Sequence, residues 1–297
     1  MSELALLLAM LAAGAWLVAV LDRATVEGAS VRALAFPVRR LALHLLRQST
    51  RTERPDLPAW KLAPAAYLAL AFCGLAVVPL GPGRVVAATP AGIVLWGAVE
   101  SLVVVAVFLH GWSANSPLPL VAGYRYVASG LVAMLVSMFV LIAAALPAES
   151  LALGAVVESQ RELWNVLRHP LGLPLFAILG LSVSLRGPLN FGDSADLCDG
   201  TAAEVSGVSS AVWQAARTGM LVAFSAMAAT VFLGGYLGPV LPGPVWLALK
   251  TAVVLVVMVL IGHRIARWDP GRFLTLAWVV LLPLSFLHLA IAGLVAL

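Results

Sequence analysis

Apolar residues in this chain form long continuous runs, and runs of this length recur from end to end. A helix needs roughly 20 residues to cross the hydrocarbon core of a membrane. Unbroken apolar runs do not fit the alternating pattern of a membrane β-barrel, so the backbone polar groups must be satisfied within helices. We therefore predict an all-α transmembrane bundle of about eight spans, with residues 1–297 forming a single membrane domain. The expected spans are 3–21, 61–80, 90–110, 120–146, 170–187, 206–236, 245–264 and 273–295.

Composition supports the same class of protein. Hydrophobic residues make up 62% of the chain and charged residues 11%, whereas a soluble domain carries about a quarter charged residues. The first apolar run begins after Glu3 and lacks the basic segment that precedes the apolar part of a signal peptide. We therefore expect a retained span there, and no large soluble domain elsewhere.

Basic residues are distributed unevenly between the expected loops. The even-numbered loops hold only Arg84, Arg161 and Arg168, and most other Lys and Arg residues fall in the odd-numbered loops. Positive charge marks the cytoplasmic side of a membrane protein. The net charge of +4 is therefore interpreted as a topology signal, and no nucleic-acid partner is expected. The pattern predicts a multi-pass protein of the cell (inner or plasma) membrane, with both termini facing outward.

The first cytoplasmic loop contains a predicted amphipathic helix at 31–48. Its arginines lie largely off an apolar stripe at helical spacing, as is typical of a helix lying in the membrane interface. The stripe consists of Leu34, Val38, Leu41, Leu45 and Leu46. Two roles remain open for this helix, namely adhesion to lipid or a floor beneath a soluble partner.

The loop at 186–207 is acidic, unlike the other cytoplasmic loops. It contains Asp193, Asp196, Asp199 and Glu204 among several glycines. A net-negative loop is an exception to the positive-inside pattern and suggests contact with another molecule. An ordinary solvated loop is the alternative.

Three charged residues fall inside the expected spans. They are Glu100, Arg217 and Lys250. A charge at the centre of a membrane helix costs roughly 2.5–3.5 kcal/mol on insertion scales, so such residues face the bundle interior and find partners. A proton or ion relay is one interpretation, and a structural ion pair of Glu100 with Arg217 or Lys250 is the other. Lys250 has the further option of extending towards an interface.

The sequence shows no constellation typical of a bound metal or cofactor. Cys73 and Cys198 lie in unrelated segments, and no histidines have ligand-like spacing on facing helices. No catalytic nucleophile or phosphate-binding loop is recognisable. We therefore expect this chain to bind no cofactor or metal and to carry no catalytic residue, so that any redox centre lies on another chain.

Four ordered segments together resemble a known family, the H-subunit (NADH dehydrogenase subunit 1) family of respiratory complex I. The same family includes the membrane anchor of energy-converting hydrogenases and of formate hydrogenlyase. The resemblance extends over residues 1–297. The segments are 111–116 with 123–125; 170–172 with 186–188; 204–207 leading to 228–235; and 249–251 with Arg264, Arg267, Asp269 and 279–284.

The resemblance implies a membrane subunit of a complex I-like NADH:quinone oxidoreductase. In that family the subunit docks the peripheral arm, forms part of the quinone chamber and begins the proton path. Quinone is then the substrate of the complex, and iron–sulfur clusters and flavin belong to partner subunits. The expected partners are lipid, quinone and other membrane and peripheral-arm subunits. The candidates for the chamber and arm interface are Arg125, Arg186, Asp196, Glu204 and Arg267, and those for the intramembrane relay are Glu100, Arg217 and Lys250.

This sequence also departs from the family pattern. Glutamates of the family fall here on Met134, Val183 and Arg217, and Glu100 stands where the family is usually uncharged. A neutral residue cannot exchange a proton, so the usual carboxylate chain cannot operate unchanged. The pattern indicates a divergent paralogue, with either a rerouted proton path or mainly an anchoring role.

Two other functions remain open at this point. The same scaffold could anchor an energy-converting [NiFe] hydrogenase, in which no quinone takes part. A secondary transporter belongs to a different class, and the lack of an internal repeat argues against it.

Overall fold

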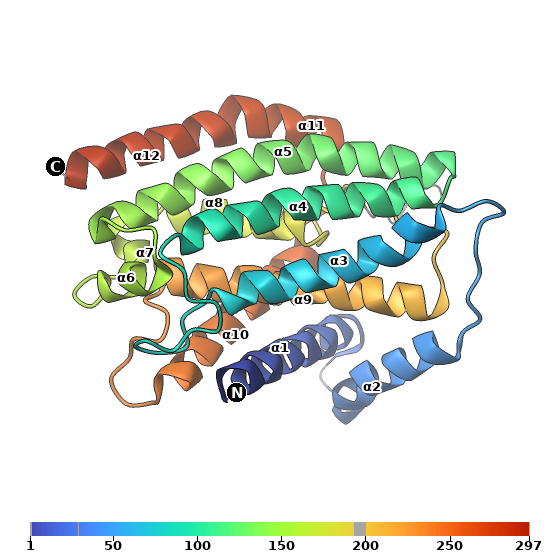
Figure 1. The fold of residues 1–297 in the computed structure, drawn as a ribbon, viewed down its shortest axis with the longest axis horizontal. Coiled ribbons are helices and arrows are strands. Elements are labelled where there is room, and N and C mark those ends of the chain that lie inside the picture. The colour runs from blue at the N-terminus through green and yellow to red at the C-terminus, as the bar shows by residue number, and fades with distance from the viewer. Residues whose placement is uncertain (1, 29, 193–199, 297) are drawn as a thin grey trace.

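The computed structural model describes residues 2–28, 30–192 and 200–296, and within them the chain is helical, with one isolated β-bridge between Gly81 and Arg84. The elements are α1 (Ser2–Glu27), α2 (Val31–Leu46), α3 (Leu57–Ala76), α4 (Gly92–Ser113), α5 (Pro117–Ala145), η1 (Leu146–Ala148), α6 (Leu153–Glu158), α7 (Asn165–Arg168), α8 (Gly172–Val183), α9 (Gly207–Phe232), α10 (Gly243–Arg264), α11 (Pro270–Leu276), η2 (Ala277–Leu281) and α12 (Leu282–Ala296). Figure 1 shows them as an elongated bundle.

Seven helices in the described part of the chain are long and apolar enough to cross a membrane. They are α1, α3, α4, α9, α10, the continuous segment Pro117–Ala148 and the segment Pro270–Val295. The predicted all-α membrane class is therefore confirmed.

The fifth expected span, at 170–187, differs from the others. Only Gly172–Val183 is helical there, and these 12 residues extend about 18 Å at 1.5 Å per residue. This is short of the roughly 30 Å hydrocarbon core. The chain after α8 turns at Leu185, whose φ is +54°, and Pro188 follows, which cannot donate a helical hydrogen bond.

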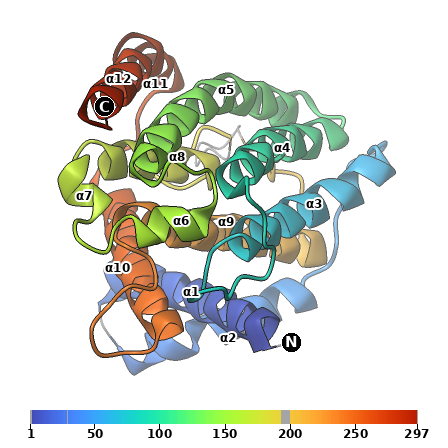
Figure 2. The same ribbon diagram turned by 60° about the vertical axis from the view of Figure 1, so that its left-hand side comes forward.

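Helix α9 is the centre of the bundle. It packs against α3, α10, α8, α1 and α2, and the others surround it in Figure 2. Small residues permit these close approaches, as is usual between membrane helices. A Cβ on Gly14 of α1 would lie 2.8 Å from Val222 of α9. On another side, Phe224 packs against Trp96 at a ring-centroid distance of 5.0 Å.

One end of the bundle, which we call the loop end, holds the connections α2–α3, α4–α5, α8–α9 and α10–α11. Hydrogen bonds join these connections to one another. They are Asp56 N to Ser113 O (2.9 Å), Asn115 Nδ2 to Arg54 O (3.1 Å), Ser206 Oγ to Gln48 O (2.9 Å) and Trp268 N to Pro188 O (3.2 Å). The loop end is therefore a joined surface rather than a set of separate loops.

The opposite end carries α6, α7 and the C-terminus (Figure 1). Two buried amides hold it together. Asn165 Nδ2 donates to Ala144 O and Val231 O, at 3.1 and 2.9 Å. Gln160 Nε2 donates to Thr230 O at 3.1 Å, and its Oε1 accepts from Gly234 N at 3.0 Å. These bonds fasten α6 and α7 to α5 and α9.

Helix α2 lies where the amphipathic segment was expected. It packs against α1 and α9, while Leu34, Val38, Leu41 and Leu45 of its apolar stripe are exposed. An exposed apolar stripe suits lipid or a partner surface. That α2 lies in the membrane interface stays a prediction.

Candidate functional site

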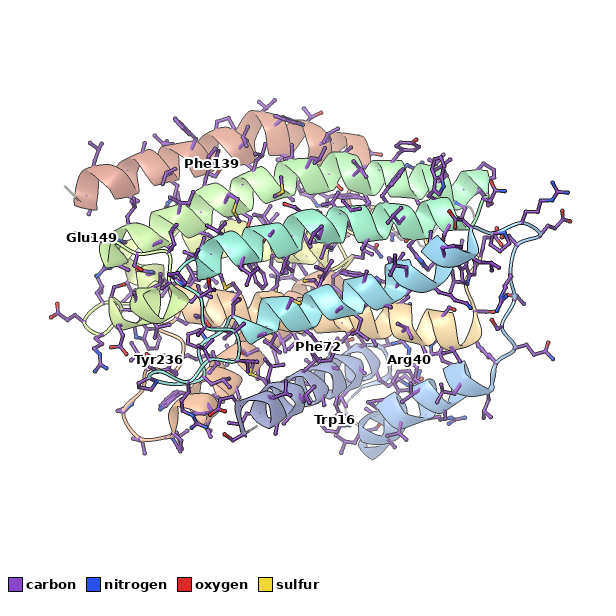
Figure 3. The ribbon with its side chains drawn as sticks, in the orientation of Figure 1. Trp16, Arg40, Phe72, Phe139, Glu149 and Tyr236 are labelled. Carbon is purple, nitrogen blue, oxygen red and sulfur yellow. The ribbon has the colours of Figure 1, made fainter. Side chains whose placement is uncertain are left out.

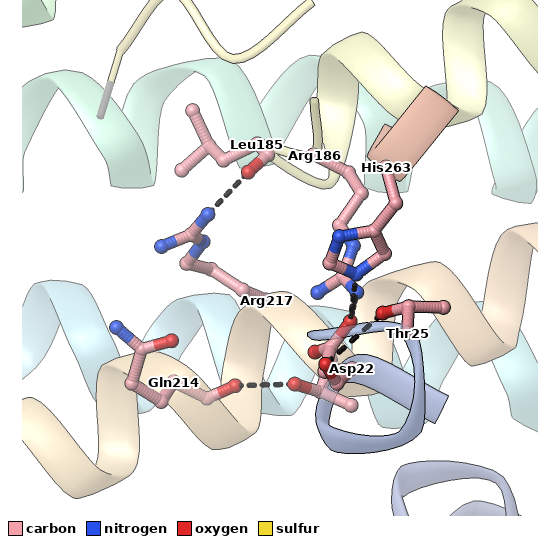
Figure 4. A network of polar contacts seen from close by, with 8 residues as sticks. Asp22, Thr25, Leu185, Arg186, Gln214, Arg217 and His263 are labelled. Carbon is pink, nitrogen blue, oxygen red and sulfur yellow. Dashed lines mark hydrogen bonds and ion pairs between the residues drawn. The ribbon is translucent and has the colours of Figure 1, made fainter. Parts of the chain in front are cut away.

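A polar cluster near the loop end is centred on Asp22, near the end of α1. Its carboxylate pairs with Arg186, in the turn after α8, and lies 2.8 Å from Nε2 of His263, in the last turn of α10. Figure 4 shows both side chains converging on Asp22. One carboxylate therefore connects three elements that are far apart in the sequence.

Two glycines allow these elements to meet. A Cβ on Gly262 of α10 would lie 2.8 Å from the carbonyl oxygen of Gly187, and a Cβ on Gly187 would lie 3.0 Å from the carbonyl oxygen of Gly262. Backbone therefore packs directly against backbone. This contact places the neighbouring Arg186 and His263 on the same side of Asp22.

Arg217 of α9 faces this cluster from the other side. Its guanidinium donates a hydrogen bond to the carbonyl oxygen of Leu185, as Figure 4 shows. Leu185 has a left-handed φ of +54°, which is uncommon for a residue other than glycine. The turn after α8 thus presents a carbonyl group to the interior.

Asp22, Arg186 and Arg217 line a cavity of about 210 Å³, which we call the chamber. It lies between α1, α2, α9 and the turn after α8. Its polar lining residues are Asp22, Arg40, Ser184, Arg186, Gln214, Arg217 and Thr218.

A second cavity, of about 290 Å³, adjoins the chamber and is mainly apolar. We call it the groove. It lies between α1, α2 and α9, with Trp16, Val38 and Leu41 among its lining residues. Figure 3 shows Trp16 and Arg40 in this region of the bundle. The two cavities share Ala19, Arg40, Gln214 and Thr218, so the apolar groove leads into the polar chamber.

The chamber is rich in positive charge. Arg40 on α2 lies at the junction of the two cavities. Burial lowers the pKa of its guanidinium, and the charges of Arg217 and Arg186 lower it further, whereas Asp22 raises it. These opposing effects indicate that the four groups interact electrostatically across the chamber.

Comparison with known proteins now identifies the family. The NADH dehydrogenase family model matches residues 6–293. The NADH-quinone oxidoreductase H subunit 1 of Rhodopseudomonas palustris is 35% identical over 251 residues, which cover 83% of this chain and 79% of that protein. The NADH-quinone oxidoreductase H subunit 2 of Cereibacter sphaeroides is 32% identical over 257 residues, which cover 84% and 81%.

The chain belongs to the H-subunit family of NADH-quinone oxidoreductases. The resemblance predicted from the ordered segments is confirmed. The protein is a multi-pass membrane protein of that family, and its relatives are named as subunits of NADH-quinone oxidoreductase. Within the described residues, no group of three or more His, Cys, Asp or Glu side chains could hold a metal ion.

The three relay candidates of this membrane subunit lie apart. Glu100 is buried in α4, where Oε1 accepts from Trp96 Nε1 at 2.6 Å and from Ser137 Oγ at 2.7 Å. Among the described residues it forms no ion pair, so the pairing of Glu100 with Arg217 or Lys250 suggested by the sequence is not formed. Trp96 and Ser137 donate hydrogen bonds to its carboxylate instead.

Lys250 lies towards the opposite end of the bundle. Its ammonium group donates to Gly235 O at 3.0 Å and to Leu237 O at 2.7 Å. It also lies 4.5 Å from the centroid of the Trp164 ring, a cation–π arrangement. This geometry agrees with the alternative in which Lys250 extends towards an interface.

The arm-interface candidates gather around the loop end. Arg186 lies in the chamber, and Arg267 Nη2 donates to Asn190 O at 3.4 Å. Glu204 accepts from Ser116 Oγ at 3.5 Å, and Arg125 is half-buried in α5. Asp196 lies outside the described residues.

Asp22, Arg40, Gln214 and His263 were not among the predicted site residues. Asp22 and His263 lie near helix ends and Arg40 lies on the amphipathic helix, where polar residues are common and attract no notice. Gln214 lies within a span, but it is uncharged and so was not noticed among the charged residues there. One signal was available for Asp22. It is an acidic residue in a loop that the positive-inside pattern makes strongly basic.

At the centre of the bundle, Val183 occupies a position where the family resemblance places a glutamate. Its carbonyl oxygen accepts hydrogen bonds from the hydroxyls of both Tyr67 and Tyr126, each at 2.9 Å. The two tyrosines are buried. The two tyrosine hydroxyls therefore donate to a backbone carbonyl oxygen here. A carbonyl oxygen cannot take up and release a proton as the side chain of a glutamate can.

Proposed function

We propose that this membrane subunit docks the peripheral arm of its complex, forms part of the quinone chamber and begins the proton path. One observation carries the proposal, namely an apolar groove that continues into a polar chamber. A quinone has the same division, with an apolar tail and a ring bearing two hydrogen-bond acceptors. Binding sites for small molecules are commonly apolar with a few convergent polar groups.

The tail of the quinone would lie in the groove, against Trp16 of α1 and Val38 and Leu41 of α2. The ring would pass Arg40 and Gln214, which line both cavities. Guanidinium and amide groups can donate to the ring oxygens. In this arrangement α2 forms one wall of the entry from the bilayer.

Arm docking is assigned to the loop end. The connections there are joined by hydrogen bonds, which gives a partner a preformed surface. They also carry most of the basic residues of the loops. The positive-inside pattern predicts that this end faces the cytoplasm and that both termini face outward.

The proton path is assigned to Glu100, Arg217 and Lys250. Arg217 lies in the chamber, Glu100 lies in the core and Lys250 lies towards the opposite end. Because ionisable residues inside membrane bundles commonly mark proton pathways, we propose these three as separate stations rather than one network, with Arg217 acting as a fixed positive charge because a guanidinium does not release its proton. Water between them would complete the transfer.

The first test concerns the assembly. A tagged chain purified in mild detergent should retain subunits that bear flavin and iron–sulfur clusters. Recovery of a nickel-ligating large subunit instead would assign the chain to an energy-converting hydrogenase. Purification as a lone, active carrier would support a transporter.

The second test concerns the groove. Ala15 of α1 lines it, whereas Ala13 of the same helix is exposed elsewhere. Ala15→Trp should raise the KM for quinone by about tenfold, equivalent to about 1.4 kcal/mol, and leave NADH oxidation by ferricyanide unchanged. Ala13→Trp is the matched control and should behave as the wild type. Equal KM values for both variants would contradict the proposed entry.

A further inference from the structure

Two buried histidines meet at the end of the bundle opposite the loop end (Figure 1). His169 lies between α7 and α8, and His288 lies in α12. His169 is 5% exposed and His288 is 6% exposed. Their ring centroids are 5.5 Å apart, and the ring planes are nearly perpendicular, at 89°. Neither residue belongs to the chamber or to the proposed proton path, so the pair has no role in the function proposed above.

Each of these rings has a nitrogen without a partner. Nε2 of His169 and Nε2 of His288 are buried, and neither forms a hydrogen bond to any described residue. Burying a polar atom without a partner is costly, and native proteins rarely leave such atoms unpaired. Two such nitrogens on adjacent rings indicate a ligand that binds imidazole.

The separation of the rings fits a shared metal ion. A zinc ion lies roughly 2.0–2.1 Å from a histidine nitrogen and takes a tetrahedral set of ligands. Two imidazoles on one such ion therefore have ring centroids about 5 Å apart, close to the 5.5 Å observed here. The other buried histidine contact differs, because His110 stacks on Trp213 at 3.8 Å and leaves no room for an ion between the rings.

The nitrogen of His288 lies over the turn that carries His169. The N–H of Gly172 donates to the carbonyl oxygen of His169 at 3.0 Å, and a Cβ on Gly172 would lie 3.5 Å from Nε2 of His288. The side chain of His288 therefore extends from α12 to the beginning of α8. An ion bound there would join these two helices.

The pair lies directly beneath the surface. Leu167, Pro170 and Leu171, which flank His169 in the chain, are exposed. A small ion therefore has a short path to the rings. Burial favours the neutral form of imidazole, which is the form that binds a metal, and imidazole nitrogen suits zinc, copper and nickel.

We propose that His169 and His288 form a zinc-binding site, with water completing the coordination of the ion. The site has two protein ligands, fewer than the three or four that hold a resident zinc. The ion therefore binds reversibly, as a ligand of the folded bundle rather than as a cofactor. This inference does not depend on the proposed quinone function.

A zinc titration of the purified complex tests the site. The complex is treated with a chelator and desalted, and its thermal midpoint is then measured at increasing Zn²⁺ concentration. The midpoint of the wild type should rise, because a ligand that binds only the folded state stabilises it. His169→Gln and His288→Gln each remove one of the two ligands, so each should need about tenfold more Zn²⁺, or more, for the same rise.

The control variant is His44→Gln, which removes a histidine from α2, towards the loop end, and should respond to Zn²⁺ as the wild type does. Mg²⁺ prefers oxygen ligands and should leave the midpoint of the wild type unchanged. The absence of a rise with Zn²⁺ in the wild type would overturn the site. So would an equal rise in the wild type and the two variants, or an equal response to Mg²⁺. Because the two variants alter different elements, either one decides the matter if the other does not assemble.

Discussion

Buried polar side chains in this protein differ in how completely they are hydrogen-bonded. Gln160 hydrogen-bonds to backbone groups through both ends of its amide, and Asn165 donates to two backbone carbonyls while its side-chain oxygen accepts from Arg168, so that both fasten one end of the bundle. Glu100 Oε2 and both ring nitrogens of His110 have no partner among the described residues. Unpaired buried polar atoms are rare in native proteins, so Glu100 and His110 are the side chains at which a functional role is most readily tested.

Glu100→Gln tests the relay at the scale of one atom. The amide oxygen can still accept from Trp96 and Ser137, so the complex should assemble. Glutamine cannot release a proton, and proton transfer by a positioned side chain contributes roughly 10²–10⁴-fold to a rate. We expect proton translocation coupled to quinone reduction to fall by about tenfold or more, measured with a pH-sensitive dye in sealed vesicles.

The matched control for this variant is Glu149→Gln, which removes an exposed carboxylate at the opposite end. It should pump normally. Normal pumping by an intact Glu100→Gln complex would remove Glu100 from the proton path.

His169, between α7 and α8, predicts a dependence of stability on pH. Burial lowers its pKa from 6.5 to about 4, with smaller effects from His288 and Arg168. The unfolded chain therefore binds more protons than the folded chain between these values, and stability falls as the pH drops. From pH 7 to pH 5 we expect a loss of about 2 kcal/mol in the free energy of unfolding.

The measurement is the thermal midpoint of the purified complex at both pH values. His169→Gln removes the titrating group, so its midpoint should change less between them. A change as large as that of the wild type would show that His169 is not the cause.

At the scale of elements, the short helix α8 accounts for the position of the chamber. A full-length span at 170–187 would have carried Arg186 past the bundle interior. Because α8 ends at Val183 and the chain turns at Leu185, Arg186 and the Leu185 carbonyl face Asp22 and Arg217 instead. The shortened helix and its turn therefore form one wall of the chamber.

Gly262→Ala tests the contact that holds α10 beside this turn. The new Cβ would meet the Gly187 carbonyl oxygen at 2.8 Å, and overpacking of this kind costs about 1–3 kcal/mol. We expect a lower thermal midpoint and a higher KM for quinone, because the Asp22 cluster is displaced. Gly293→Ala in α12 is the control, since its Cβ would meet no atom within 4 Å. Equal midpoints and KM values for the two variants would show that the glycine contact does not position the chamber.

At the scale of the whole molecule, the two ends of the bundle have different characters. The loop end joins four connections and adjoins the chamber, whereas the opposite end is closed by α6, α7 and their amide contacts (Figure 1). This asymmetry suits a protein that receives a large partner on one side only. Its direction in the membrane is predicted by the basic residues.

Single cysteines test that direction. In a background with Cys73 and Cys198 replaced by serine, Ser49→Cys at the loop end should react with an impermeant thiol reagent only in inverted vesicles. Ser150→Cys, at the opposite end, should react only in intact cells. The reverse pattern would invert the predicted topology and place the arm-docking surface on the outside.

The sequence alone determined the membrane class, most of the spans and the family. Each of these depends on features that are local or ordered along the chain, such as apolar runs and the four segments. A charge within an apolar run is conspicuous wherever it occurs, which placed Arg217 among the candidate residues, and the family resemblance placed Arg186 there. The amphipathic helix was also visible, since its period is set by the geometry of a single helix.

Only the tertiary structure decided which side chains meet. In the folded chain Asp22 contacts Arg186 and His263. Glu100 accepts hydrogen bonds from Trp96 and Ser137 and does not pair with a basic residue of the described chain. Such contacts depend on helix rotation and on backbone approaches such as that of Gly187 and Gly262. Sequence spacing fixes the face of one helix but not which face of a neighbour it meets. The chamber is therefore a property of the folded bundle.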